Sequence, residues 1–526
     1  MKKRFWGFVS IAIAFGMIFA SCATNNASGP VKRELGKAYE LTILHLNDTH
    51  GAVVATDGKG GLSFVADCIK KEKAKATNSL VVHAGDINTG SALSNMFNAE
   101  PDIKAFNAMG VDVATLGNHE FDGTMAKLKK QISQSKFTWL SANIKTANGK
   151  YFTKPYIIKN YDGFRIAVVG LTTNRTQVIA SPDKSLVFAD EIETAREMVK
   201  IVREQELADI VIFATHIGDV EEAIGHVSSV KLAQSVEGID LIIDGHSHSY
   251  FEKPLVVNGC YIVSANEYGK YVGKGVMEIV DGKLKSFNWA PIAITSDNFS
   301  PDPQVEKILA PYIDKANKSL KDVVLKTTAE FEFGNRLPRY IETAIGDFVA
   351  DAVVDYVEST GVKLDGAFTN GGNIRAPLPK GNVTREDILT VLPFENYVYV
   401  ISLKGDDVER LFQFIASIKQ GNGGFAQVSK EIRYTITYDK NGNGKLSNLT
   451  IGGKPIDKNK TYRIATNDYL AGGGDGYEIL KKSVDTYNTS MLFSTVVIDY
   501  AARLGSGAIT PMTDGRITVI GGTLPE

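Results

Sequence analysis

The chain has 526 residues, more than the roughly 250–300 at which a single hydrophobic core stops growing, so at least two domains are expected. Hydrophobic residues make up 44% and charged residues 22% of the sequence, which is typical of a globular protein rather than a disordered chain. The 58 basic and 60 acidic residues nearly balance, which excludes a broad electrostatic binder of nucleic acid polymers, and three cysteines are too few for a disulfide scaffold.

The first 22 residues have the pattern of an export signal. Basic residues at positions 2–4 precede an apolar run at positions 5–20, and Phe19-Ala20-Ser21-Cys22 resembles a bacterial lipobox. We therefore expect an exported protein, periplasmic or at the cell surface, that is anchored to a membrane through an acylated Cys22. An ordinary cleaved signal is the alternative. Residues 23–39 begin with small and polar residues and are predicted to be a tether.

Between residues 40 and 295, short apolar runs alternate with helical stretches. The runs are rich in β-branched residues and apolar at consecutive positions, as buried strands are. They lie at residues 41–46, 80–83, 111–116, 165–171, 210–214 and 241–243. Segments such as 61–76 and 191–205 carry apolar residues at helical spacing among many charges. This alternation predicts a layered α/β domain over residues 40–295.

A linker is predicted at residues 296–325 and a second domain at residues 326–526. Ser300-Pro301-Asp302-Pro303 interrupts the chain, and positions 304–321 then show helical periodicity. In the second domain we expect helices near 342–358 and 404–417, followed by strands separated by Gly and Asn.

One segment of the second domain resembles the start of a calcium-binding loop, at residues 439–444. Thr450 stands where such a loop needs its bidentate Glu. We therefore predict a hairpin turn between strands at 434–438 and 446–451.

Two further cysteines, Cys68 and Cys260, lie in the predicted first domain. In an oxidising compartment they could form a disulfide, whereas two buried free thiols are the simpler interpretation. The sequence does not decide between these alternatives.

Five polar clusters, each containing glycine, follow predicted strands of the first domain. They lie at residues 47–51, 85–87, 117–122, 215–218 and 245–248. A single cluster could cap a helix, but five at strand ends indicate a functional site, because open α/β sheets bind ligands at the carboxyl ends of their strands. Carboxylate, imidazole and amide groups without thiolate suit Zn²⁺, Mn²⁺ or Fe. A carboxylate shared by two cations would give a two-metal centre suited to phosphoryl displacement.

These clusters resemble the signature of the calcineurin-like metallophosphoesterases. Four segments of the second domain extend the resemblance to the bacterial 5′-nucleotidase and UDP-sugar hydrolase family, over nearly all of residues 40–520. The segments are Ile345-Gly346-Asp347, Thr369 to Arg375, Leu392-Pro393-Phe394, and Asn467 to Tyr477. The resemblance implies an α/β fold in which a metallophosphoesterase β-sandwich flanked by helices precedes an α+β substrate-binding domain.

The resemblance also implies two divalent metal ions, Zn²⁺, Mn²⁺ or similar. The ligands of the first metal would be Asp48, His50, Asp86 and His248. The ligands of the second would be Asp86, Asn118, His216 and His246. Asp86 would then bridge the two ions.

His119 and Asp122 match the catalytic pair of the family. A protonated imidazole facing the phosphoryl oxygens would stabilise developing charge and the departing alkoxide. A carboxylate on its far nitrogen would fix the tautomer and favour the charged form. The alternative for Asp122 is the N-cap of a helix at 123–131, and both roles could hold.

The second domain contains matches to the substrate-binding residues of the family. These matches are Arg339, Asn370, Arg375, Phe394, Tyr469 and Asp475. The arginines would grip phosphate, Asn370 would hydrogen-bond the base, and Asp475 would accept ribose hydroxyls. Phe394 and Tyr469 would stack on the two faces of the base. For Phe394, core packing after a proline is the alternative.

The sequence therefore predicts an exported two-metal enzyme, a 5′-nucleotidase that removes phosphate from nucleoside 5′-monophosphates. The alternatives within the family are a 2′,3′-cyclic nucleotide phosphodiesterase and a pyrophosphatase acting on UDP-sugars or NAD. A surface lipoprotein that binds nucleosides or host proteins with an inactive site is more remote. His45 and His83 are expected to be core histidines, His226 is given no role, and the oligomeric state is not predicted.

Overall fold

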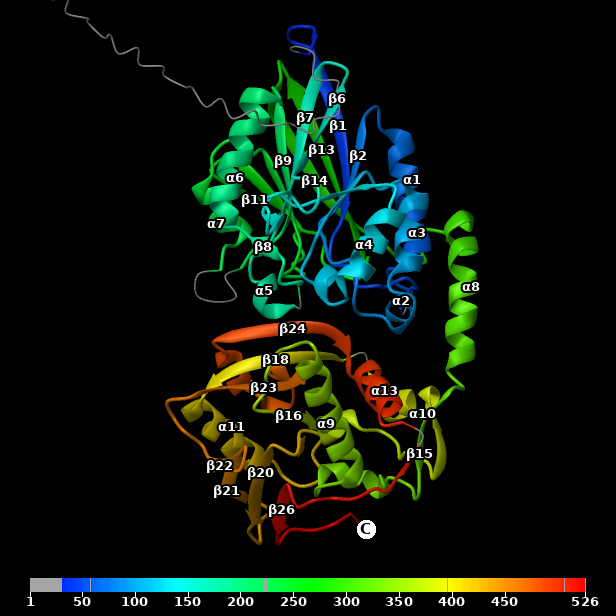
Figure 1. Cartoon of the computed structure of the whole chain (residues 1–526), viewed down its shortest axis with the longest axis vertical. Coiled ribbons are helices and arrows are strands. Elements are labelled where there is room, and N and C mark those ends of the chain that lie inside the picture. Colours follow the sequence, from blue (N-terminus) through cyan, green and yellow to red (C-terminus); the bar gives the residue numbers. More distant parts are fainter. Residues whose placement is uncertain are drawn as a thin grey trace, which may run out of the picture.

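The computed structural model describes residues 31–525 apart from 57, 181, 221–225, 395 and 506. The predicted export signal with Cys22 and the first part of the tether lie outside these residues. Within the described part of the chain, no helix has the length and apolarity to cross a membrane. Figure 1 shows two lobes, one above the other, joined at one side by α8 (Pro303–Ser319). We call the part from β1 (Ala38–Leu46) to β14 (Lys283–Ala293) the N-terminal lobe and the part from β15 (Val323–Thr327) to β26 (Ile517–Ile520) the C-terminal lobe.

The N-terminal lobe contains two six-stranded sheets. The first has the order β14 (Lys283–Ala293), β13 (Tyr271–Val280), β1 (Ala38–Leu46), β2 (Ser79–His83), β3 (Val113–Thr115) and β4 (Thr138–Leu140). The second has the order β11 (Leu255–Val257), β12 (Cys260–Val263), β10 (Leu241–Asp244), β9 (Ile210–His216), β7 (Phe164–Thr172) and β6 (Tyr156–Tyr161). Strands β1 to β4 run parallel to one another, as do β7, β9, β10 and β12. The carboxyl ends of each parallel set therefore lie at one edge of its sheet.

Alternate residues of each central strand face different hydrophobic layers. In β7, Ile166 and Val168 pack between the two sheets together with Leu41 and Leu80 of the first sheet. The intervening residues of β7 pack on the outer side of the second sheet. The N-terminal lobe thus has four layers, with helices outside two packed sheets, and the prediction of strands buried on both faces is confirmed.

The helices of the N-terminal lobe cover the outer faces of the sandwich. Those on the side of the first sheet are α1 (Leu62–Lys75), α2 (Ala92–Met96), α3 (Glu100–Met109) and α4 (Met125–Gln134). On the side of the second sheet lie α6 (Glu191–Lys200) and α7 (Ser229–Ser235), whereas α5 (Thr176–Ile179) lies at the end of the lobe that faces the C-terminal lobe. The helix predicted at 191–205 continues beyond α6 as a π-helical turn, Ile201–Gln205. A small pair of strands, β5 (Ile144–Thr146) and β8 (Leu186–Phe188), completes the lobe.

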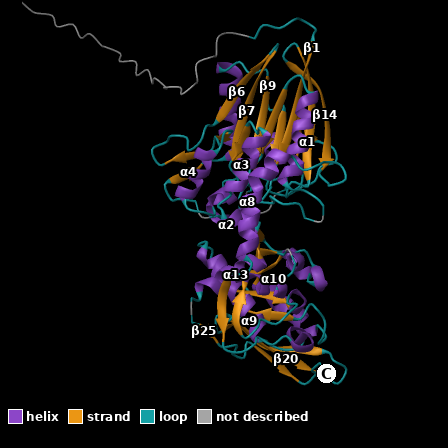
Figure 2. Cartoon of the chain, turned by 90° about the vertical axis from the view of Figure 1, so that its right-hand side faces the viewer, coloured by secondary structure: helices purple, strands orange, loops and turns teal. Residues whose placement is uncertain are grey.

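Helix α8 begins where the sequence signals predict. The Asp302 side chain accepts hydrogen bonds from the backbone N–H groups of Gln304 and Val305, at 3.1 and 3.0 Å, and Pro303 occupies the first turn. Val305 and Leu309 belong to the core of the N-terminal lobe, so the first half of α8 packs on that lobe. Figure 2 shows the helix continuing from there to the C-terminal lobe.

The C-terminal lobe is built on a five-stranded sheet and two smaller ones. The large sheet has the order β19 (Ala426–Val428), β16 (Gly366–Asn370), β23 (Thr461–Asn467), β18 (Tyr397–Lys404) and β24 (Asp485–Leu492). The smaller sheets are β17 (Gly381–Thr384), β15 (Val323–Thr327) and β25 (Ala508–Ile509), and β22 (Lys454–Pro455), β21 (Gly444–Ile451), β20 (Ile432–Tyr438) and β26 (Ile517–Ile520). Its helices are α9 (Ala344–Ser359), α10 (Arg385–Val391), α11 (Gly405–Ser417), α12 (Asp468–Ala471) and α13 (Phe493–Arg503). Both predicted helices are present, as α9 and α11.

The segment that resembles a calcium-binding loop is a hairpin turn between β20 and β21. Asp439 Oδ1 accepts hydrogen bonds from the N–H groups of Asn441 and Asn443, at 2.8 and 2.9 Å. Because the carboxylate is used to close the turn, the hairpin prediction is confirmed.

Four buried residues of the N-terminal lobe agree with the sequence interpretation. Cys68 on α1 and Cys260 on β12 are buried free thiols, so the interpretation without a disulfide is confirmed. His45 is fully buried and stacks on Trp289, with ring centroids 5.0 Å apart. His83 is fully buried, and its Nε2 lies 2.9 Å from the Thr49 hydroxyl.

Candidate active site

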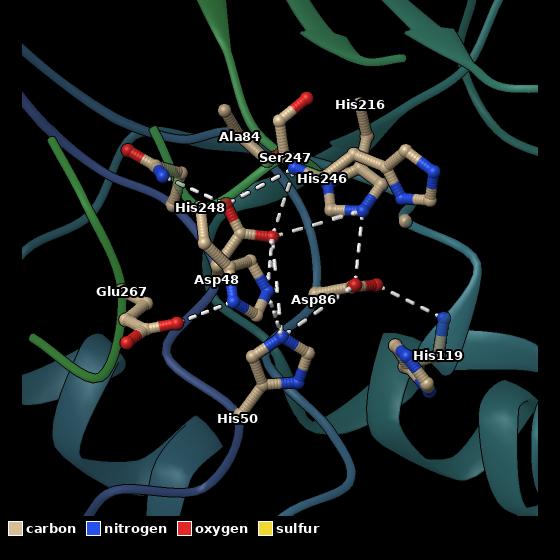
Figure 3. A network of polar contacts seen from close by, with 12 residues as sticks. Asp48, His50, Ala84, Asp86, His119, His216, His246, Ser247, His248 and Glu267 are labelled. Atoms are coloured by element: carbon tan, nitrogen blue, oxygen red, sulfur yellow. Dashed lines mark hydrogen bonds and ion pairs between the residues drawn. The ribbon is translucent and has the colours of Figure 1, made fainter. Parts of the chain in front are cut away.

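The five polar clusters meet at the edge of the sandwich where the parallel strands end (Figure 3). The residues that follow or end these strands are Asp48 after β1, Asp86 after β2, Asn118 after β3, His216 on β9, and His246 and His248 after β10. At this edge the side chains form three groups, and within each group the possible ligand atoms all lie within 4.8 Å of one another. They are Asp48 with His50 and His248, His50 with Asp86 and His119, and Asp86 with His216 and His246. Asp86 and His50 each belong to two groups, so the groups form one continuous centre.

Three histidines turn the same ring nitrogen toward this centre. The Nδ1 of His50 lies 2.9 Å from the carbonyl oxygen of Thr89, and the Nδ1 of His216 lies 2.8 Å from that of Ala84. A carbonyl oxygen can only accept, so these Nδ1 atoms carry the hydrogen and each neutral ring keeps a lone pair on Nε2. The Nδ1 of His248 contacts the Glu267 carboxylate in the same way. This arrangement is the usual one for imidazoles that bind a metal through Nε2.

The inner atoms of the centre fit metal cations. The Nε2 atoms of His50 and His248 are 3.0 Å apart, and His216 Nε2 is 2.9 Å from Asp86 Oδ2. Two lone pairs that face each other at 3.0 Å repel unless a positive charge lies near both. Asn118 Oδ1 is buried and has no hydrogen-bond partner among the described residues, which is costly unless a cation is bound to it. The donor set of carboxylate, imidazole and amide oxygen therefore fits divalent metals.

The backbone of these loops is strained where it presents the ligands. Asp48, His50 and Asp86 have positive φ angles of 49°, 45° and 57°, which non-glycine residues rarely adopt. A Cβ at Gly117 would lie 2.1 Å from Asp86 Oδ1, so only glycine allows the loops after β2 and β3 to approach this closely.

His119 and Asp122 form a close pair beside the metal-binding atoms. His119 Nδ1 lies 2.5 Å from Asp122 Oδ2, and the His119 backbone N–H donates to Asp86 Oδ1 at 2.9 Å. Burial alone would lower the pKa of His119, but the carboxylates of Asp122 and Asp86 raise it to about 9. The N-cap alternative for Asp122 is wrong, because α4 is capped by the Thr124 side chain, which accepts from the N–H of Lys127 at 3.3 Å.

Three residues that support the ligands were not singled out from the sequence. Glu120 is buried, and its carboxylate accepts four backbone N–H groups, from Asp86, Ile87, Asn88 and Gly117, at 2.6 to 3.2 Å. Asn47 donates to Asp48 Oδ2 at 2.7 Å, and Glu267 contacts the ring of His248. Glu120 and Asn47 lie inside the polar clusters, so their positions in the sequence could have indicated that they belong to the site. Glu267 lies in a loop outside these clusters, and nothing in the sequence around it indicated a role in the site.

The predicted substrate residues form a second cluster, in the C-terminal lobe. Asn370, at the end of β16, donates to Asp475 Oδ2 at 2.9 Å, and the Tyr469 hydroxyl donates to Asp475 Oδ1 at 2.9 Å. The Arg375 guanidinium lies over the ring of Phe394, 5.5 Å from its centroid. Partial burial lowers the pKa of Arg339, and the nearby charges of Arg336 and Arg375 add to this effect, as is expected where cations gather to bind an anion.

The two aromatic residues of this cluster are on the surface. Phe394 is 43% exposed and Tyr469 is 50% exposed, so the core-packing alternative for Phe394 is wrong. Exposed aromatic rings beside arginines are suited to binding a planar, anionic ligand.

The two lobes touch close to the metal-binding atoms. Tyr487 on β24 stacks on the ring of His119, with centroids 6.4 Å apart and planes at 15°. Tyr397, at the start of β18, stacks on Tyr268, with centroids 5.4 Å apart and planes at 10°. Arg175 forms an ion pair with Asp485. In Figure 1, β24 and β18 lie on the side of the C-terminal lobe that faces the N-terminal lobe.

Comparisons with known proteins agree over nearly the whole chain. Residues 41–250 match the model of the calcineurin-like phosphoesterases, and residues 323–482 match that of the 5′-nucleotidase C-terminal domain. The chain is 33% identical to protein UshA of Yersinia enterocolitica, over 92% of this chain and 95% of the relative. It is 31% identical to a 5′-nucleotidase of Vibrio cholerae, over 91% and 93% of the two chains. The solved NAD nucleotidase NadN of Haemophilus influenzae matches 93% of this chain and all of its own, with a TM-score of 0.79 and 25% identity.

Proposed function

The chain belongs to the 5′-nucleotidase family of metal-dependent hydrolases, and on this basis we propose that it hydrolyses nucleoside 5′-monophosphates to nucleoside and phosphate. The observation that carries the proposal is the pairing of two clusters in one chain. A centre of carboxylates and imidazoles surrounds Asp86 in one lobe, and exposed aromatic rings lie beside arginines in the other. The first is suited to phosphoryl chemistry and the second to recognition of a nucleotide.

We assign the carboxylate, imidazole and amide residues around Asp86 in the N-terminal lobe to two divalent cations. Asp48, His50, Asp86 and His248 would hold one cation. Asp86, Asn118, His216 and His246 would hold the other. When bound, the cations supply Lewis-acid stabilisation of the attacking and leaving oxygens. Glu120 and Asn47 keep the carboxylates of this set in place.

His119 acts on the phosphoryl group in this proposal. Its Nδ1–H faces the Asp122 carboxylate, which leaves Nε2–H of the protonated ring free to donate to a phosphoryl oxygen or to the departing alkoxide. The Asp122 carboxylate beside Nδ1 favours the charged form of the ring.

The C-terminal lobe binds the nucleotide in this proposal. Arg339 and Arg375 bind the phosphate. Asp475 accepts hydrogen bonds from the ribose hydroxyls, and Asn370 hydrogen-bonds the base. The exposed rings of Phe394 and Tyr469 stack on the two faces of the base. We propose 40–295 for the metal-binding domain, 296–325 for the linker and 326–526 for the substrate-binding domain, where the first strand of each domain begins slightly earlier, at Ala38 and at Val323. We also propose that residues 1–22 form a lipoprotein-type signal segment that is cleaved before Cys22, so that the mature chain begins at a lipid-bearing Cys22, continues through a tether at 23–39, and lies in the periplasm or on the cell surface.

A second candidate function is cleavage of a phosphoanhydride, as in NAD or UDP-sugars. It is favoured by the likeness to the NAD nucleotidase NadN, which extends over 93% of this chain. Cleavage of a 2′,3′-cyclic nucleotide would use the same metal-binding residues.

The proposal is tested by phosphate release from enzyme that has been stripped with a chelator and reloaded with Zn²⁺, Mn²⁺, Mg²⁺, Ca²⁺ or Co²⁺. The substrates are AMP, 2′,3′-cyclic AMP, UDP-glucose and NAD, with a phosphatase added for the products of the last three. We expect metal-dependent turnover, with the highest kcat/KM for AMP. A higher kcat/KM for NAD or UDP-glucose would favour the second candidate. Nucleoside binding in chelator, without turnover under any metal, would contradict enzymatic function.

A further inference from the structure

Three carboxylates converge in the C-terminal lobe, outside the two clusters described above. Glu342 precedes α9, Asp347 lies in the first turn of α9, and Asp514 precedes β26. One oxygen from each lies within 4.8 Å of the other two. Two oxygens that bind the same Ca²⁺ at about 2.4 Å are at most about 4.8 Å apart, so this spacing fits a single ion of that size.

Asp347 is the residue that makes this group unusual. Its side chain is buried, with 3% of the residue exposed, and neither carboxylate oxygen has a hydrogen-bond partner among the described residues. Arg516 Nε lies 3.7 Å from Oδ2, too far for a hydrogen bond. Burial raises the pKa of Asp347 to about 8, with Glu342 and Asp514 adding to the effect against the opposing charge of Arg516. A buried carboxylate in this position needs a proton or a cation to neutralise it.

The nearby basic residues are already paired with other acids. Arg516 donates to both oxygens of Asp351, at 2.7 and 2.8 Å, and through Nε to Asp514 at 3.1 Å. Arg433 Nη1 lies 3.3 Å from Asp514 Oδ1. If Arg516 balances the charge of Asp351 and Arg433 balances that of Asp514, no basic residue among those described is left to balance Glu342 and Asp347. Two negative charges match one divalent cation.

We propose that Glu342, Asp347 and Asp514 bind a hard divalent cation, with Ca²⁺ as the best match. The donors are all oxygens, and Ca²⁺ accepts irregular coordination completed by water or backbone carbonyls, whereas Mg²⁺ demands a near-ideal octahedron. The Glu342 carboxylate already accepts the N–H groups of Asp514, Gly515 and Ile517, at 2.8 to 3.0 Å. The cation would therefore tie the segment before β26 to the start of α9.

The test is calorimetric titration of the full chain with Ca²⁺, combined with the melting temperature Tm. The parent protein carries Asp86→Asn alone, and every variant carries it too, so that any Ca²⁺ bound at the catalytic centre contributes equally to each. The parent should bind one Ca²⁺ more than Asp347→Asn does, with a Kd of about 10⁻⁴–10⁻³ M, and its Tm should rise with Ca²⁺. In Asp347→Asn the binding at this site should weaken at least about tenfold and the rise in Tm should be lost.

Asp439→Asn, in the hairpin between β20 and β21, is the matched control and should behave as the parent does. Equal binding by the parent and Asp347→Asn, or loss of binding in Asp439→Asn, would overturn the proposal. So would an infrared band of a protonated carboxyl group that persists in the parent with saturating Ca²⁺ and is absent from Asp347→Asn, because a proton would then be the neutralising charge. If Asp347→Asn does not fold, the more exposed Asp514→Asn replaces it under the same criteria.

Discussion

Glu120 contacts neither substrate nor metal in the proposed mechanism, yet four backbone N–H groups point at its carboxylate. These groups belong to the loop that carries Asp86 and the loop that carries Asn118. A single buried carboxylate thus fixes two ligand loops with respect to each other, because two oxygens can each accept two hydrogen bonds.

At this scale we predict that Glu120→Gln weakens metal binding by about 10–100-fold. The amide retains only one oxygen, and its NH₂ group faces backbone donors, so buried N–H groups lose their acceptor. Titration of stripped enzyme with Zn²⁺ or Mn²⁺ measures the effect, and excess metal should restore most of the activity. The exposed Glu40→Gln is the control. Unchanged metal affinity in Glu120→Gln would show that the carboxylate does not position the ligands.

At the scale of single elements, two neighbouring polar residues before α4 have different contacts. Thr124 caps the helix, whereas the Asp122 carboxylate points to His119. Both residue types are good N-caps, so the sequence alone allowed Asp122 to take the cap.

We therefore predict opposite effects for two substitutions before α4. Thr124→Ala should lower the free energy of unfolding by about 1 kcal/mol and leave kcat unchanged, because only the cap is lost. Asp122→Asn should leave stability nearly unchanged and lower kcat at least about tenfold, because the imidazolium loses its carboxylate. Denaturant unfolding and AMP hydrolysis measure the two effects. A large stability loss in Asp122→Asn without a change in kcat would reverse the assignment.

The strands and the positions of the polar clusters could be predicted from sequence because each depends on a local signal. The apolar run at 210–214 predicts a buried strand, and Thr215 and His216 come directly after it, at the end of β9. The support of these residues could not be predicted in the same way. Glu120 reaches a loop more than 30 residues away, and Glu267 reaches His248 from a separate loop. Which donors converge on a carboxylate depends on the tertiary fold rather than on sequence spacing.

At the scale of the whole molecule, the two lobes have separate tasks in the proposed reaction. Tyr487 of the C-terminal lobe lies against His119, and Tyr397 lies against Tyr268, so the lobes meet over the metal-binding centre. Substrate has to reach His119 between them. Helix α8, which packs on the N-terminal lobe by its first half, is the connection about which the lobes could move.

Base recognition by the C-terminal lobe is tested by Tyr469→Ala. The substitution should lower kcat/KM for AMP by roughly tenfold to a hundredfold, since one stacked face contributes on the order of 1–3 kcal/mol. Ribose 5-phosphate has no base to stack, so its slow hydrolysis should change little. Steady-state kinetics on both substrates makes the comparison, because a folding defect would depress both. Equal losses on the two substrates would remove the stacking role.

The central claim is that two cations share Asp86 and that hydrolysis depends on them. The most direct measurement is the metal content of purified wild-type enzyme and Asp86→Ala, by elemental analysis, alongside AMP hydrolysis by the same samples. We predict two divalent ions per wild-type chain, fewer in the variant, and no detectable hydrolysis of any phosphate ester by the variant with its fold intact. Substantial hydrolysis by well-folded Asp86→Ala, or wild-type activity with a single ion per chain, would contradict the account.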